Sequence, residues 1–276
     1  MNYVPLGLSD LVIAASLLLI NALISFAFKL NLEKTLAVAA VRMVVQLAAV
    51  GFVLKLIFAT TSPWVTLAAG LFMGGVAGIE AAARLERPFE GWLAYGLGAS
   101  TLLVTGLLAA VFTTTVIIGP QPWYQPRVVL PVLGMVLGNA LTGVSLVLDT
   151  LSDVASRERA SIEARLALGA TRFAAFDVVL RRALRTGLMP ILNTMAAAGV
   201  VALPGMMTGQ ILAGVAPIEA AKYQMMILFV IAGSTALAVI ATALGGVLLL
   251  TDDRQDRKST RLNSSHLRLS RMPSSA

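Results

Sequence analysis

The polar passage RERASIEARLALGATRFAAFDVVLRRALRTGLMP, residues 157–190, stands alone in a chain that is otherwise apolar. Its apolar positions recur at helical spacing, which predicts amphipathic helix. They are Ile162, Leu166, Phe173, Phe176, Val179 and Leu180. Gly169 interrupts the pattern and Thr171 is placed to cap a second helix, so the sequence predicts a helix, a tight turn and another helix. Because the rest of the chain has the composition of membrane spans, this segment is where it can meet a soluble partner.

Two interpretations of this segment stay open on its residues alone. In one, its seven arginines hold a basic helical pair on an anionic membrane surface. In the other, the segment docks into a second protein. The pair Glu163-Ala164, followed after four residues by Gly169, resembles the EAA signature in permease subunits of ABC transporters. In that family a short cytoplasmic helix sits in a cleft of the ATPase subunit.

Composition sets the class of protein. The chain has 276 residues, of which 58% are hydrophobic and 13% charged, and its mean hydropathy is +0.85. A soluble domain of this size could not hide so much apolar surface, so we predict a polytopic membrane protein. The chain has no cysteine, which excludes disulfides, thiolate metal sites and thiol catalysis.

The last residues, KSTRLNSSHLRLSRMPSSA at 258–276, break abruptly from what precedes them. They hold four positive charges and His266, and without those four the formal net charge falls from +7 to +3. The tail lacks apolar periodicity and resembles translated adapter or vector sequence, so we predict a disordered, non-native tail, with a genuine basic tail as the alternative. Nucleic acid is not an expected partner, because the remaining arginines cluster where membrane topology would put them.

Apolar runs predict about seven transmembrane helices, each long enough for a hydrocarbon core of about 30 Å. The predicted spans are 11–28, 36–58, 63–79, 92–118, 128–148, 188–203 and 223–250. Pro190, Pro204 and Pro217 interrupt the uncharged stretch 186–218. We therefore expect the sixth helix to start near Leu188, and residues 204–214, PGMMTGQILAG, to form a non-helical or re-entrant piece.

Lysine and arginine positions predict the orientation. With seven spans and the N-terminus outside, the inner side collects the arginines of 157–190 together with Lys29, Lys34, Arg84 and Arg87. The outer side has Arg127, with Lys55 and Lys222 at its margins. This asymmetry favours N-out, C-in and places the coupling segment, residues 149–187, in the cytoplasm.

Catalytic motifs are absent from the sequence. No G-x-x-x-x-G-K-[ST], H-E-x-x-H or G-x-S-x-G occurs, and His266 in the tail is the one histidine. Neither an enzyme nor a proton-coupled carrier is expected, because no acidic residue lies deep in a predicted span. What remains for a path through the membrane is a set of neutral polar and sulfur groups. Our candidates are Gln46, Asn139, Asn193, Met206, Thr208 and Gln210, although methionines also fill gaps in helical cores.

A longer set of motifs carries a more specific resemblance. These are Glu163–Thr171 (EARLALGAT), Arg181-Arg182-Ala-Leu-Arg185, Pro190-Ile-Leu-Asn193-Thr-Met195, Leu203–Gly214 (LPGMMTGQILAG), Tyr223-Gln224, Arg42 with Gln46, and Gly134-Met135 with Gly138-Asn139. Together they look like the FetB family of iron-export permeases, to which plant aluminium-tolerance permeases also belong. The similarity covers roughly residues 8–253.

The resemblance implies a permease that pairs with a separately encoded P-loop ATPase, as a dimer of permeases with two ATPases, in the inner (cell) membrane. Docking to the ATPase would fall to Glu163, Ala164, Gly169, Thr171 and Phe173. The chain itself would bind no cofactor, because ATP is hydrolysed by the partner. Family members have been linked to iron export and, in plants, to nucleotide-sugar export, so the substrate, its direction and any metal ligands stay open.

We therefore predict an all-α polytopic membrane protein with one permease domain over residues 1–257. Its expected function is ATP-driven export of a metal ion, most plausibly iron. The alternative is a stand-alone carrier or channel, which predicts transport without any ATPase. That class favours an ionisable residue or an inverted repeat inside the membrane, and the sequence shows neither.

Overall fold

The computed structural model describes residues 7–84 and 93–251, and the tail 258–276 lies outside them. Within these residues the chain is helical with no strand, which confirms the all-α prediction. In chain order the helices are α1 (Leu8–Ala27), α2 (Glu33–Ile57), α3 (Pro63–Ala83), α4 (Leu93–Phe112), η1 (Thr113–Ile118), α5 (Pro126–Arg157), α6 (Arg159–Ala167), α7 (Arg172–Ala175), α8 (Asp177–Ala197), α9 (Gly205–Leu212) and α10 (Pro217–Leu250). They fall into two compact units, described separately below.

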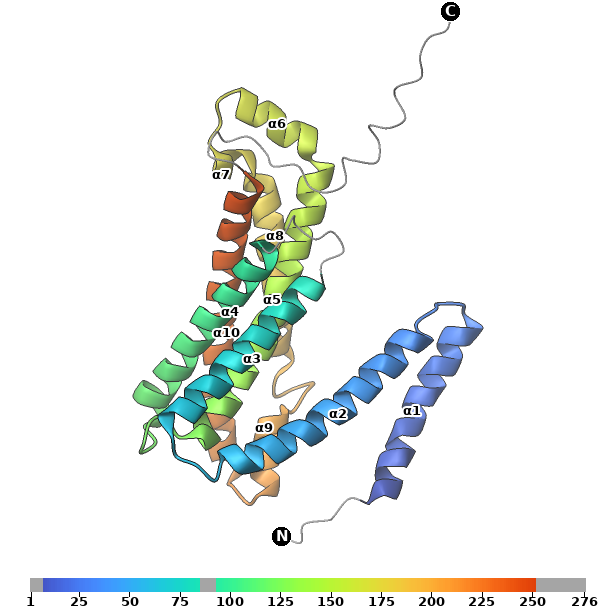
Figure 1. Cartoon of the computed structure of the whole chain (residues 1–276), viewed down its shortest axis with the longest axis vertical. Coiled ribbons are helices and arrows are strands. Elements are labelled where there is room, and N and C mark those ends of the chain that lie inside the picture. Colours follow the sequence, from blue (N-terminus) through green and yellow to red (C-terminus); the bar gives the residue numbers. More distant parts are fainter. Residues whose placement is uncertain (1–6, 85–92, 252–276) are drawn as a thin grey trace, which may run out of the picture. The chain divides into compact units, whose positions relative to one another are not determined.

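The first unit, residues 1–61 with 212–214, is the hairpin of α1 and α2 (Figure 1). At its turn Lys29 and Asn31 adopt left-handed backbone angles, with φ of 53° and 56°. The Ser25 hydroxyl ties the turn together: it donates to Glu33 Oε1 at 3.1 Å and accepts from the Leu32 amide at 3.1 Å. No residue of α2 is buried, so this helix packs very little within its own unit.

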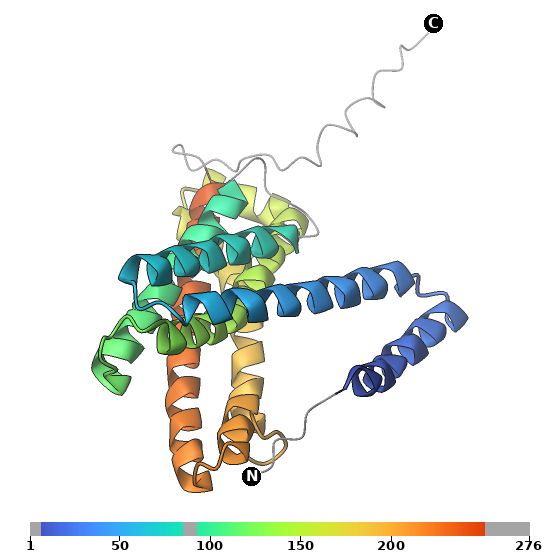
Figure 2. The same cartoon turned by 60° about the horizontal axis from the view of Figure 1, so that its bottom comes forward.

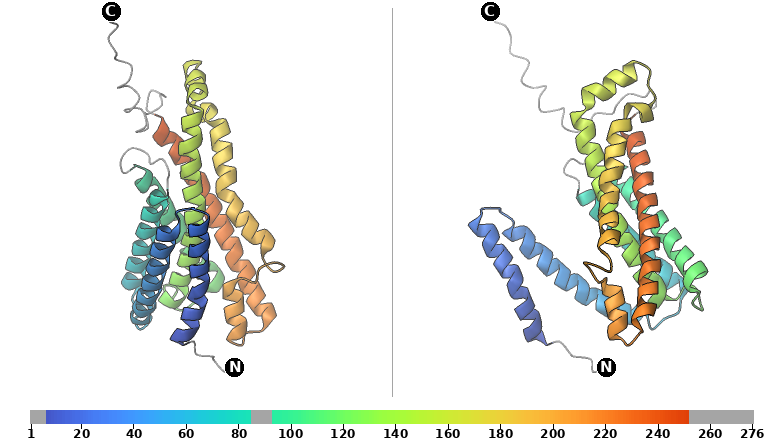
Figure 3. Two further views of the ribbon diagram at one scale, coloured as in Figure 1. Left: turned by 90° about the vertical axis from the view of Figure 1, so that its right-hand side faces the viewer. Right: turned by 180° about the vertical axis from the view of Figure 1, so that it is seen from behind.

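The second unit, residues 62–211 with 215–276, is a bundle of α3, α4, α5, α8 and α10. Helix α5 is its centre and packs against the other four. Figure 2 shows α8 and α10 running side by side, and the two views of Figure 3 show α5 next to α8. Helices α6 and α7 lie at one end of this bundle and α9 at the other (Figure 1). The core is built from alanine, valine and leucine of all five helices.

Glycines set how closely the helices of the second unit approach. A Cβ on Gly74 would stand 2.7 Å from Leu103 Cγ, and one on Gly78 would overlap Ala99, so α3 and α4 touch at these two glycines, which lie one helical turn apart. A second crossing joins α5, α8 and α10. A Cβ on Gly143 would stand 2.9 Å from the Gly187 carbonyl oxygen and 2.8 Å from Val239 Cγ2.

The predicted boundaries need two corrections after residue 148. Helix α8 begins at Asp177 rather than near Leu188, and Pro190 lies inside it. The proline removes one backbone bond but does not end the helix, since packing of Gly187 and Ile191 against the bundle continues on either side of it. Residues 204–214 were expected to be non-helical or re-entrant, whereas Gly205–Leu212 is helix α9.

Among residues 7–84 and 93–251, six helices are long and apolar enough to cross a membrane: α1, α2, α3, α4 with η1, α5 and α10. They correspond to six of the seven predicted spans. The remaining one corresponds to α8, which has 21 residues but carries Arg181, Arg182 and Arg185 in its first half. A seventh crossing and the N-out orientation therefore stay predictions.

Candidate functional site

The turn between α6 and α7 is built as a capped helix end. The Ala170 amide donates to the Arg165 carbonyl at 3.0 Å, and the Gly169 amide donates to Leu166 at 2.9 Å. These two bonds make a Schellman motif, which requires a left-handed residue, and Gly169 supplies it with φ +87°. Thr171 then caps α7, its hydroxyl oxygen accepting from the Ala174 amide at 3.4 Å. The structure confirms the predicted helix, tight turn and helix.

One side of this element is anchored in the bundle. Ile162 of α6 and Phe176, which follows α7, are 2% and 0% exposed and belong to the same buried cluster as Leu151 and Leu250. An aromatic ring with no exposed surface contributes several kcal/mol of burial, on the order of 3. The element is therefore fixed to the bundle rather than free to swing.

The other side faces outward. Glu163, Ala164 and Gly169 are exposed, and so are two apolar side chains, Leu168 at 88% and Phe173 at 40%. Of the five predicted coupling residues, Gly169, Thr171 and Phe173 lie at the turn and the start of α7, and Glu163 and Ala164 lie on α6 just before it. Leu168 is a coupling candidate that the sequence did not predict, since the helical periodicity placed it on neither face. An apolar tip on a fixed element is typical of a protein-docking surface.

Acidic partners neutralise several arginines of the coupling segment. Arg159 lies 2.7 Å from Glu163, and Arg181 lies 2.9 Å from Asp177. The hydrogen bond and charge of Asp177 raise the pKa of Arg181 above its ordinary value. Glu163 is thus held by its own helix, with its side chain 46% exposed. Such exposed pairs add little stability, so their conspicuous effect is on the charge pattern of the surface.

Two of the path candidates lie on neighbouring helices of the bundle. Helix α5 keeps a half-buried stripe at positions three and four apart, which includes Met135, Thr142 and Asp149, with Asn139 at its edge. The Asn139 side-chain amide donates to the Met135 carbonyl at 2.8 Å. On α8, which packs against α5, Asn193 is exposed.

Several exposed or half-buried residues of α5 and α8 are small or polar, and such side chains are unsuited to contact with the hydrocarbon chains of lipid. We use the name α5/α8 face for six half-buried or exposed residues of these two helices. They are Gly138, Asn139 and Thr142 on α5 and Met189, Asn193 and Ala196 on α8. Amides in a hydrocarbon core face protein or water, and small residues permit close helix contact. The face therefore has the composition of a protein interface or of one wall of a polar path.

The three candidates on α9 share one end of the bundle. Met206 packs against the buried cluster that contains Val136, Ile191 and Ile227. Thr208 donates to the Gly205 carbonyl at 3.0 Å and is satisfied within its own helix. Gln210 differs, because its side-chain oxygen is buried without a hydrogen-bond partner.

Helix α10 holds further unpartnered oxygens, which sequence reasoning missed. They belong to Gln224, Thr235 and Thr242. At 100° per residue these positions fall within about 20° of one another around the helix, so they form one line along its core-facing side. The helical period of 3.6 residues could have shown that these three residues share one side of the helix. They were missed because they are widely spaced in an otherwise apolar sequence. A buried acceptor without a donor is costly unless water or a ligand reaches it.

Gln46 belongs to the first unit, so its position relative to the other candidates is not defined. Among residues 7–84 and 93–251, no three acidic or histidine side chains gather in the way that a resident metal ion requires.

Comparison of the sequence with known proteins identifies its family. Residues 8–248 match the model of the uncharacterised protein family UPF0014. The chain belongs to the UPF0014 family. A UPF0014 membrane protein of Synechocystis sp. is 37% identical over 215 residues, which cover 77% of this chain and 81% of the relative. No solved structure matches the chain.

Two further UPF0014 relatives have names that bear on function. The probable iron export permease protein FetB of Escherichia coli is 33% identical over 84% of this chain and 87% of its own length. The protein ALUMINUM SENSITIVE 3 of Arabidopsis thaliana is 32% identical over 83% of this chain and 82% of its own. The described part of the chain holds six apolar helices long enough to span a membrane, so this UPF0014 member is a multi-pass membrane protein of a permease family.

Proposed function

We propose that the chain is the permease subunit of an ABC transporter that exports a metal ion, with iron as the first candidate. The observation that carries the proposal is the turn between α6 and α7, where Leu168 and Phe173 are exposed on an element anchored by Phe176. An exposed apolar tip of this kind is suited to the cleft of a separate ATPase. The name of the E. coli relative supports iron as the cargo.

The proposed path uses the α5/α8 face. A single copy leaves Asn193 exposed and Asn139 half-buried, so the path is complete when a second permease copy covers the face. Amide and hydroxyl oxygens from two copies would supply hard donors for a divalent cation. ATP binding by the partner subunits would move the α6–α7 element as a rigid body and change access to the path. The same proposal places the complex in the inner membrane.

The docking half of the proposal is tested by co-purification with the candidate P-loop ATPase. Leu168→Asp places a charge on the exposed tip and should reduce the retained ATPase at least about tenfold, since a buried unpaired charge costs more than 1.4 kcal/mol. The matched control is Asn31→Asp at another predicted cytoplasmic turn, where the positive φ of 56° suits aspartate. Equal retention by both variants and the wild type would contradict docking at this turn.

The cargo half is tested in proteoliposomes that contain both subunits. Ferrous ion should stimulate ATP hydrolysis and move with it, and Asn193→Leu should reduce both while the ATPase stays bound. Transport of iron without any ATPase would favour the stand-alone carrier. ATP-driven transport that ignores iron and other metals would retain the ABC permease and reject the metal.

A further inference from the structure

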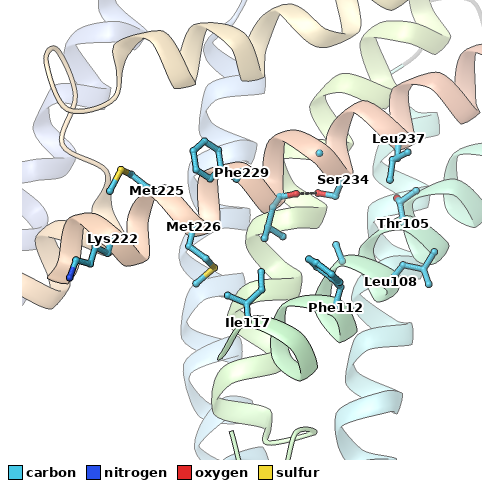
Figure 4. A pocket seen from close by; sticks show the side chains of 13 residues that line it. Thr105, Leu108, Phe112, Ile117, Lys222, Met225, Met226, Phe229, Ser234 and Leu237 are labelled. Carbon is cyan, nitrogen blue, oxygen red and sulfur yellow. Dashed lines mark hydrogen bonds between the residues drawn. The ribbon is translucent and has the colours of Figure 1, made fainter. Parts of the chain in front are cut away.

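A groove of about 740 Å³ runs between α4 with η1 and the first half of α10 in the second unit (Figure 4). Its wall is formed chiefly by bulky apolar side chains, among them Leu108, Phe112, Met226, Phe229 and Leu237. Leu108, Phe229 and Leu237 are each more than 60% exposed. In the second unit taken by itself the groove is therefore open along one side, and it shares no residue with the α5/α8 face.

The polar groups of the groove are satisfied within the chain, except at one end. The Thr105 hydroxyl donates to the Thr101 carbonyl at 2.6 Å, and the Ser234 hydroxyl donates to Val230 at 2.7 Å. Neither needs a ligand. The one charged residue in the wall is Lys222, at the end shown on the left of Figure 4. The chemistry fits an occupant with a long apolar body and one anionic end.

The dimensions fit a hydrocarbon chain that enters from the membrane surface. Lys222 and Leu237 are separated along α10 by about 22 Å at 1.5 Å per residue, whereas half of a hydrocarbon core is about 15 Å. Helix α10 is a candidate membrane span, and Lys222 lies near its N-terminal end. An acyl chain that starts beside Lys222 and reaches the middle of the membrane is shorter than the groove, so all of it can lie within the groove.

The lining favours lipid over a protein helix. Membrane helices that pack against one another use small residues, as Gly143 and Gly187 do in this bundle. Of the thirteen residues that line the groove, eight are bulky apolar side chains of leucine, isoleucine, valine, phenylalanine and methionine, and four are small. Methionine side chains adapt to irregular partners, which suits a flexible acyl chain.

We propose that the groove binds one acyl chain of a membrane phospholipid, with the lipid phosphate at Lys222. The Lys222 ammonium lies 2.7 Å from Glu219 Oε1 and remains 62% exposed. That ion pair uses one of its three N–H donors, so the other two can reach phosphate oxygens. The proposal does not depend on the transport proposal or on its cargo.

Native mass spectrometry of the full-length protein in mild detergent tests the acyl-chain part. The wild type should retain one phospholipid. Gly233→Leu fills the groove without a clash, since a Cβ there meets nothing within 4 Å, and should lower lipid occupancy about tenfold by displacing buried methylenes. Gly75→Leu is the matched control on α3, where the added Cβ also meets nothing within 4 Å. Gly233→Ala should give an intermediate loss and guards against misfolding of the leucine variant.

The phosphate part is tested by adding lipids back to delipidated protein. Palmitoyl-oleoyl phosphatidylglycerol should bind about fivefold more tightly than palmitoyl-oleoyl glycerol, which has the same chains without phosphate. Lys222→Ala should abolish this preference and Lys222→Arg should keep it. A wild type without lipid, equal losses in Gly75→Leu and Gly233→Leu, or an unchanged preference in Lys222→Ala would each overturn the proposal.

Discussion

The crossing of α5, α8 and α10 depends on single glycines. A Cβ on Gly187 would overlap the Val147 side chain and stand 3.0 Å from the Gly143 carbonyl oxygen, and the backbone oxygen cannot move aside cheaply. We expect Gly187→Ala to destabilise the bundle by about 1 to 3 kcal/mol through overpacking. A thermal unfolding scan in detergent would measure the loss. Gly75→Ala on α3 is the control, because a Cβ there meets nothing within 4 Å. Equal melting temperatures of both variants would contradict this packing.

Sequence spacing predicted only part of this glycine packing. The four-residue interval of Gly70, Gly74 and Gly78 is typical of close helix packing, and Gly74 and Gly78 do pack against α4. Gly134 and Gly138 share this interval, but a Cβ on Gly138 meets nothing within 4 Å in a single copy of the chain. The Gly143–Gly187 crossing was missed since its two members lie on different helices and share no period. The line of Gln224, Thr235 and Thr242 was missed because burial decides which polar residues lack partners.

The α6–α7 element depends on the left-handed conformation at Gly169. Residues with a Cβ pay about 1–2 kcal/mol in this region, and asparagine pays least. We expect Gly169→Val to speed hydrogen exchange of the amides that close the turn, at Gly169 itself and Ala170, by about five- to thirtyfold. Gly169→Asn should show a smaller change. Exchange measured by mass spectrometry would distinguish the two, and equal rates in both variants would show that φ +87° is not required.

Element boundaries were predictable where composition changes sharply. The apolar runs predicted α1, α2 and α3 to within four residues at each end, because charged or proline residues flank them. Helix α5 runs nine residues past its predicted end at Leu148, and α10 begins six residues before its predicted start at Tyr223. Boundaries near prolines were harder to predict. Pro190 suggests a helix start near Leu188, whereas packing of Gly187 and Ile191 continues α8 through the proline. Helix α9 was not expected, since glycine, methionine and threonine in residues 204–214 have weak helix signals and the segment follows a proline.

At the scale of the molecule, the sequence identified the family and the structure added two surfaces of different character. The α5/α8 face is small and polar, and the groove beside α10 is bulky and apolar. We propose different occupants for the two surfaces: a second permease copy at the α5/α8 face and a phospholipid acyl chain in the groove. Whether one domain spans residues 1–257 stays a prediction, because the hairpin of α1 and α2 forms a unit of its own. Sequence periodicity could not predict the proposed contact of the α5/α8 face with a second copy, because periodicity reports only which residues share a face of one helix.

The absence of cysteine makes the topology directly measurable with single-cysteine variants. We expect a membrane-impermeant maleimide to label Gln121→Cys in spheroplasts but not Ser161→Cys, because the arginine-rich side stays inside. Ala202→Cys, after the end of α8, decides the number of crossings. Labelling there means that α8 returns to the outer side and that the chain has seven spans. Protection there means six spans, with the residues after α10 outside. All three must label after permeabilisation. A labelled Ser161→Cys beside a protected Gln121→Cys would reverse the orientation and remove the α6–α7 turn from the reach of a cytoplasmic ATPase.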